Sequence, residues 1–130
     1  MNRFVANAVA GFVVIVAFSA VSEAQAPAIK RTLLQRTDLG DGREAIMGIA
    51  EIASGGSTGR HTHFGIEQGY VMDGTTTLEV EGEAPRLLKA GDSYTIPAGR
   101  VHNATATSGN AKVLASVSYT HLTLPTICSV

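Results

Sequence analysis

Three of the four histidines of this 130-residue chain lie in two short segments, one of which also holds a carboxylate. His61 and His63 are two residues apart, so on a β-strand their side chains share one face, and Glu67 follows four residues later. His102 opens a later segment, directly after a turn of the Pro-x-Gly type. Three imidazoles and one carboxylate that converge from adjacent strands form a site for a first-row divalent metal ion. The alternative is a pair of solvated strand histidines with an unrelated third.

Short β-strands are the elements predicted to position these side chains. The chain has 14 glycines and only 5% aromatic residues, a composition that favours many turns over long helices. The predicted strands are Glu44–Ala53, Arg60–His63, Gln68–Met72, Thr75–Glu81, Arg86–Leu88, Ser93–Ile96, Val101–Thr107 and Ala111–Ala115. Several short strands separated by turn residues predict a single all-β domain, a sandwich or a barrel.

Turn residues add detail to this arrangement. Gly40–Gly42 predicts a turn, because glycine adopts positive φ without strain. Asp73–Gly74 predicts a tight hairpin between the strands on either side of it. In Thr75–Glu81 the even-numbered residues are expected to face the core and the odd-numbered ones the solvent.

Composition and charge exclude several classes of function. A net charge of −1 provides no basic surface for nucleic acid, and a single cysteine allows neither an intramolecular disulfide nor a cysteine-based zinc finger. No nucleophile–base pair is recognisable. Four residues could move a proton, but strand tyrosines and turn or surface carboxylates are usually structural, so no catalytic role is assigned to them. These residues are Glu51, Tyr70, Asp92 and Tyr94.

The N-terminus has the pattern of a secretory signal. A basic start at Arg3 is followed by a largely apolar stretch and then by small residues at alternate positions. Cleavage after Ala24 leaves Gln25 as the first residue, which avoids a bond to Pro27. We therefore expect residues 1–24 to be a signal peptide and the protein to be exported, either periplasmic or secreted. The alternative is an uncleaved membrane anchor, since the largely apolar stretch of 18 residues, Phe4–Val21, is just long enough to span a bilayer.

The histidine segments match two sequence motifs without a gap. The first is Gly55-x5-His61-x-His63-x3-Glu67-x6-Gly74, and the second is Gly91-x5-Pro97-x-Gly99-x2-His102. In both motifs the chain resembles the small single-domain bacterial cupins of the type-2, RmlC-like jelly-roll superfamily. One position departs from the pattern, because Ala106 stands where the family carries an asparagine that is not a metal ligand.

The resemblance implies an all-β fold, the cupin double-stranded β-helix or jelly-roll barrel, over residues 43–115, with residues 25–42 as an N-terminal lead-in. It also implies that His61, His63, Glu67 and His102 are the ligands of a divalent transition metal. Fe, Mn, Cu, Ni, Co and Zn all suit such a ligand set, so the identity of the metal stays open.

The implied function is that of an exported, metal-binding cupin. One hypothesis is a dioxygenase-like enzyme, or another oxygenase, lyase or isomerase, that acts on a small organic substrate. The alternative is a non-catalytic module that binds a small ligand through its metal. The expected partners are a small molecule, no nucleic acid, and a membrane only through the signal segment; a homodimer through the sheet edges is compatible with the family.

The C-terminal residues differ in composition from the charged, glycine-punctuated sequence that precedes them. Val117–Thr126 resembles one reading frame of a common sequencing-library adapter, which identifies residues 116–130 as a non-native tail. His121 and Cys128 then carry no functional information, and the last native strand of the barrel is missing or replaced. The alternative is a genuine C-terminal strand over Leu114–Leu124, where β-prone residues alternate.

Overall fold

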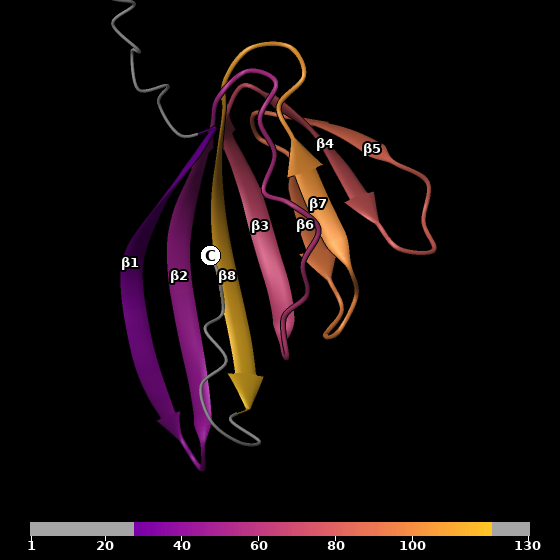
Figure 1. The fold of residues 1–130 in the computed structure, drawn as a ribbon. Coiled ribbons are helices and arrows are strands. Elements are labelled where there is room, and N and C mark those ends of the chain that lie inside the picture. Colours follow the sequence, from indigo (N-terminus) through magenta and orange to yellow (C-terminus); the bar gives the residue numbers. More distant parts are fainter. Residues whose placement is uncertain (1–27, 121–130) are drawn as a thin grey trace, which may run out of the picture.

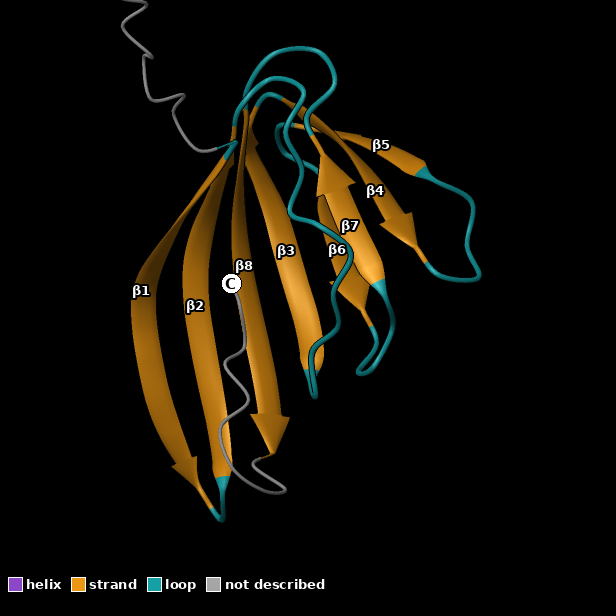
Figure 2. Ribbon diagram, in the orientation of Figure 1, coloured by secondary structure: helices purple, strands orange, loops and turns teal. Residues whose placement is uncertain are grey.

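The computed structural model describes residues 28–120, which form eight β-strands and no helix (Figures 1 and 2). The strands are β1 (Ile29–Gly40), β2 (Arg43–Ile52), β3 (Ile66–Asp73), β4 (Thr75–Val80), β5 (Arg86–Lys89), β6 (Ser93–Ile96), β7 (His102–Thr105) and β8 (Ala111–Thr120). Nothing in this part of the chain is therefore a helix that could cross a membrane. The predicted signal peptide lies outside the described residues.

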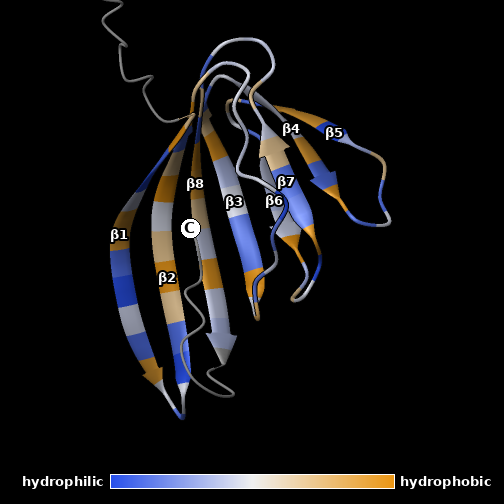
Figure 3. Ribbon diagram, viewed as in Figure 1, coloured by the Kyte–Doolittle hydropathy of each residue, from blue (hydrophilic) through white to orange (hydrophobic). Residues whose placement is uncertain are grey.

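Two antiparallel sheets make up the fold and confirm the all-β, jelly-roll prediction. The larger sheet has the order β1-β2-β8-β3-β6, and the smaller sheet has the order β5-β4-β7. Alternate residues of most strands point into a core that both sheets share, with Ile52, Ile96 and Leu78 among its fully buried side chains. The buried row of β4 is Thr76, Leu78 and Val80, as the alternation predicted. Figure 3 shows apolar and polar residues alternating along several strands.

The turn at Asp73–Gly74 exists, but the predicted hairpin is wrong. β3 and β4 belong to different sheets, so this turn is a corner at which the chain leaves one sheet for the other. Gly74 has a φ of 72°, and a Cβ built on it would lie 2.1 Å from the carbonyl oxygen of Asn110. The turn residues were identified correctly, but a local pattern does not show with which strand each neighbour pairs.

The N-terminal lead-in forms a full strand at the edge of the larger sheet. β1 pairs with β2 over almost its whole length, and the predicted turn at Gly40–Gly42 joins the two strands. All residues of β1 are exposed apart from Ile29, which is half-buried. β1 therefore extends the sheet but adds almost nothing to the core.

The last strand continues past the predicted domain boundary at residue 115. Residues 116–120 belong to β8, where Val117 pairs with Ile46 of β2 and is buried. A β-prone segment can pair in this way whatever its origin, so the adapter origin of the tail stays a prediction. Residues 121–130 lie outside the described part of the chain.

Candidate metal centre

The β2–β3 loop, residues 53–65, carries the first two histidines and lies against β7 (Figure 1). The predicted strand Arg60–His63 is wrong, because this segment makes only an isolated bridge to β7. The amide of His61 donates to the carbonyl of His102 at 3.0 Å, and the amide of His102 donates back at 2.9 Å. The amide of Gly99, in the turn before β7, donates to the carbonyl of His63 at 2.8 Å. Both ends of the histidine pair are thus fixed by backbone hydrogen bonds.

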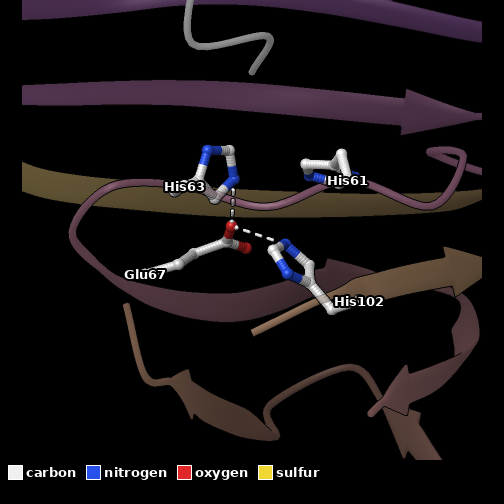
Figure 4. Close-up of side chains that lie close together, drawn as sticks. All are labelled: His61, His63, Glu67 and His102. Carbon is white, nitrogen blue, oxygen red and sulfur yellow. Dashed lines mark hydrogen bonds and ion pairs between the residues drawn. The ribbon is translucent and has the colours of Figure 1, made fainter. Parts of the chain in front are cut away.

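All four sequence-predicted site residues meet at one point between the sheets (Figure 4). Their candidate ligand atoms lie within 4.8 Å of one another. Glu67 projects from β3, His102 from the start of β7, and the other two histidines from the loop. His63, Glu67 and His102 are buried, and His61 is half-buried. The convergence inferred from sequence is correct, although no strand carries His61 and His63.

Two backbone carbonyls determine which ring nitrogens carry protons. Nδ1 of His61 lies 2.8 Å from the carbonyl oxygen of Gly59, and Nδ1 of His102 lies 2.9 Å from that of Arg100. Because a carbonyl can only accept, each Nδ1 must donate, which leaves Nε2 of the neutral ring with a free lone pair. Nε2 of His102 lies 3.2 Å from Oε2 of Glu67. This contact is a hydrogen bond when a proton lies between the two atoms, and it becomes coordination when a metal ion takes the place of that proton.

The carboxylate of Glu67 is compensated on both oxygens. Oε2 is 2.8 Å from Nε2 of His63 and 3.2 Å from Nε2 of His102, while Oε1 accepts the hydroxyl of Tyr94 at 2.8 Å. Burial alone raises the pKa of Glu67, but the hydrogen bonds from His102, His63 and Tyr94 outweigh burial and hold this pKa well below its usual range. Glu67 is therefore an anion at neutral pH, as a ligand of a divalent cation must be.

Tyr94 is a site residue that the sequence interpretation left without a role. It lies on β6 opposite Gly69 of β3, and a Cβ on Gly69 would lie 2.0 Å from Cζ of the Tyr94 ring. The missing side chain lets the ring lie flat over β3, so that its hydroxyl reaches Glu67 two residues along the same face. Burial and the charge of Glu67 raise the pKa of Tyr94 above its usual value, so the hydroxyl keeps its proton and donates a hydrogen bond to Glu67. A glycine within a strand is the sequence signal of such a close approach.

A small cavity leads to the cluster. It encloses about 40 Å³, and its walls include Leu78, Val113 and Val117 from both sheets. This small volume beside the histidines favours a compact group. The other proton-moving candidates lie elsewhere, since Glu51 pairs with two lysines and Asp92 accepts the amide of Lys89 in a turn. Both carboxylates are structural, in agreement with the sequence-based expectation.

The departure from the second motif lies away from the ligand atoms. Ala106 follows β7 and is fully buried in the core. Its amide donates to the carbonyl of Gly56 and its carbonyl accepts the amide of Gly55, so the backbone of this position fastens the start of the β2–β3 loop. Asn103, the nearest asparagine, points instead toward Glu79 and Thr105. The absence of an asparagine at position 106 therefore leaves the four-residue cluster intact.

Known proteins share this architecture. Residues 48–117 match the sequence profile of the family described as a cupin domain. KdgF from a Halomonas species is 28% identical in a structural superposition with a TM-score of 0.60, which covers 72% of this chain and 80% of that one. No curated protein matches the chain in sequence.

Two further solved structures are similar at the level of the fold alone. A cupin superfamily protein from Desulfitobacterium hafniense DCB-2 is 21% identical with a TM-score of 0.63, over 75% of this chain and 83% of that one. A recombinant oxalate oxidase in complex with glycolate is 22% identical with a TM-score of 0.59, over 75% of this chain and 53% of that one. The fold therefore recurs in proteins whose sequences have diverged widely.

Replacing Tyr94 by phenylalanine should destabilise the metal-free protein at pH 7. The change removes one donor from a buried carboxylate, and a hydrogen bond to a charged group contributes about 1.5–3 kcal/mol to the free energy of unfolding. Urea denaturation in the presence of a chelator measures the loss. Tyr70→Phe is the matched control, because Tyr70 is 47% exposed on neighbouring β3 and should change stability by less than about 0.5 kcal/mol. Equal losses in the two variants would contradict the role given to Tyr94.

Proposed function

This chain belongs to the cupin domain family, and on that premise we propose that it binds one divalent transition-metal ion through His61, His63, Glu67 and His102. The observation that carries the proposal is the convergence of the four candidate ligand atoms within 4.8 Å, with Nε2 of His102 and Oε2 of Glu67 only 3.2 Å apart. A metal ion placed among the four side chains would take the place of the protons shared between these atoms and would be coordinated by them. Carbonyl partners on Nδ1 of His61 and His102 are also the outer contacts that orient metal-bound imidazoles.

The donor set suits several metals. Three neutral imidazoles and one carboxylate accept Fe, Mn, Cu, Ni, Co or Zn, so the ligands alone do not select one of them. When bound, a divalent ion would supply Lewis acidity toward a small molecule in the cavity. The chain itself contributes the orientation of its imidazoles, the hydrogen bond from Tyr94 that fixes Glu67, and apolar walls that limit access of water.

We further propose that the metal centre acts on a small organic molecule, as a dioxygenase-like or related cupin enzyme. A narrow, largely apolar cavity that ends at the cluster supports a compact substrate. The occurrence of an oxalate oxidase among proteins of this fold is consistent with catalysis in such a barrel. The alternative is a metal-dependent binding module, favoured by Tyr94, whose hydroxyl is already committed to Glu67 and leaves no spare acid at the cavity wall.

The metal found after purification separates these two functions. Iron or copper, together with oxygen uptake on addition of small organic acids, supports the enzyme. Zinc or manganese with a tightly retained ligand and no turnover supports the binding module.

Export is proposed on the sequence pattern of residues 1–24 alone. Sequencing the N-terminus of protein recovered from the periplasm or the medium tests it. A start at Gln25 is expected, and a start at Met1 would overturn the cleaved signal.

Removing one imidazole should abolish metal binding. His63→Ala deletes a buried member of the cluster, and the remaining three side chains leave a weaker and poorly shaped site. Metal analysis of the dialysed protein should give about one ion per chain for the original sequence and far less for the variant. His121→Ala is the control, because the tail is expected to have no part in the site. Unchanged metal content in His63→Ala would refute the ligand assignment.

Metal affinity should fall steeply as the pH drops below about 6.5, the ordinary pKa of histidine. Protons and metal compete for the same ring nitrogens, so affinity is highest where the imidazoles are neutral. Burial lowers the pKa of His61, so this ring stays neutral to a lower pH than an exposed histidine does. Protons should therefore displace the metal from His61 only at a lower pH. Metal release followed against pH measures the effect. Retention of the ion well below pH 4 would be incompatible with imidazole ligands.

A further inference from the structure

The wall of the cavity contains one cationic side chain. Apart from the four clustered residues, the lining consists of apolar side chains, Thr58, Tyr94 and Arg31. Arg31 comes from β1, the edge strand, and lies outside residues 48–117, where the family profile matches. The family match therefore does not account for its presence at the cavity.

The register of the larger sheet directs Arg31 toward the cavity. Arg31 is paired with Ala50 of β2, which in turn is paired with Val113 of β8. Residues that are directly opposite in antiparallel strands project from the same face of the sheet. Ala50 and Val113 both line the cavity, so Arg31 continues their row at its open edge. Next to it, Lys30 projects from the other face and pairs with Glu51.

The guanidinium is held in place but is not neutralised. Its Nη2 donates to the carbonyl of Thr58 at 2.8 Å, which ties it to the loop that carries His61. Of the four basic residues in β1 and β2, Lys30, Arg36 and Arg43 form ion pairs within residues 28–120, and Arg31 forms none there. A guanidinium has five N–H donors, so most of its hydrogen-bonding capacity remains for a ligand.

We propose that Arg31 recognises the carboxylate of a small organic acid bound at the metal centre; this inference rests on the proposed function. The guanidinium fork matches a carboxylate, and a metal ion held by the four clustered side chains would add further positive charge to the same cavity. Glu67 is the one acidic residue of the lining, and its oxygens already face His63, His102 and Tyr94. The small volume of the cavity, about 40 Å³, favours an acid with few carbon atoms.

Binding of a matched pair of ligands tests the inference. Glycolate and its neutral amide, glycolamide, have nearly the same shape and differ in charge. Each is titrated into the Co²⁺-loaded protein, and the visible absorption of the Co²⁺ ion reports binding. Glycolate should bind more tightly than glycolamide. In Arg31→Gln the Kd for glycolate should rise by about 10- to 100-fold, while the Kd for Co²⁺ stays unchanged. Arg86→Gln, on an exposed position of β5, should alter neither constant.

Each other outcome overturns a stated claim. If glycolamide binds the original protein as well as glycolate does, the anion preference is wrong, and this comparison needs no variant to fold. If Arg31→Gln keeps its Co²⁺ and binds glycolate as before, Arg31 only ties β1 to the loop. In both cases the metal site itself stands. If the original protein fails to bind Co²⁺, the proposed metal function falls, and the role of Arg31 falls with it.

Discussion

The burial of Glu67 is the constraint on which the centre of the molecule depends. A carboxylate removed from water carries a large desolvation penalty unless charges and hydrogen bonds surround it. Here the compensation comes from three different elements: the loop through His63, β7 through His102 and β6 through Tyr94. Removing any of these leaves a buried charge partly uncompensated. The cluster therefore joins the two sheets by polar contacts at a point where an apolar core would otherwise continue.

Two glycines near Glu67 allow the close backbone and ring contacts that this arrangement requires. Gly65 lies so close to β8 that a Cβ would overlap the carbonyl oxygen of Ser118, which brings the end of the loop directly onto the sheet. In the same way, the absence of a side chain at Gly69 leaves room for the ring of Tyr94. Gly65 at the end of the loop and Gly69 on β3 lie two residues before and two residues after Glu67, so neither position places a side chain beside the carboxylate. The site is built as much by absent side chains as by present ones.

The sequence predicted the members of the cluster better than the elements that carry them. The motif spacing correctly predicted that His61, His63, Glu67 and His102 form one cluster. This prediction was possible because the residue types and their spacing within each motif can be read directly from the sequence. The strand expected at residues 60–63 was wrong, since the segment is held by a bridge to β7, some 40 residues away. The position of Tyr94 depends on its register with Gly69, and that of Arg31 on the lead-in forming β1. Pairings of this kind are decided by contacts between distant segments.

β1 differs from the other strands in being exposed along almost its entire length while still reaching the cavity through Arg31. Substitutions at the exposed positions of this strand leave the shared core untouched, so they should be tolerated far more readily than changes at the buried positions of β3 or β8. Related chains could therefore diverge in the molecules that they accept by altering one edge strand, while the interior that holds the four clustered residues is preserved. Selection for a new ligand and selection for a stable barrel would then act on separate parts of the same small protein.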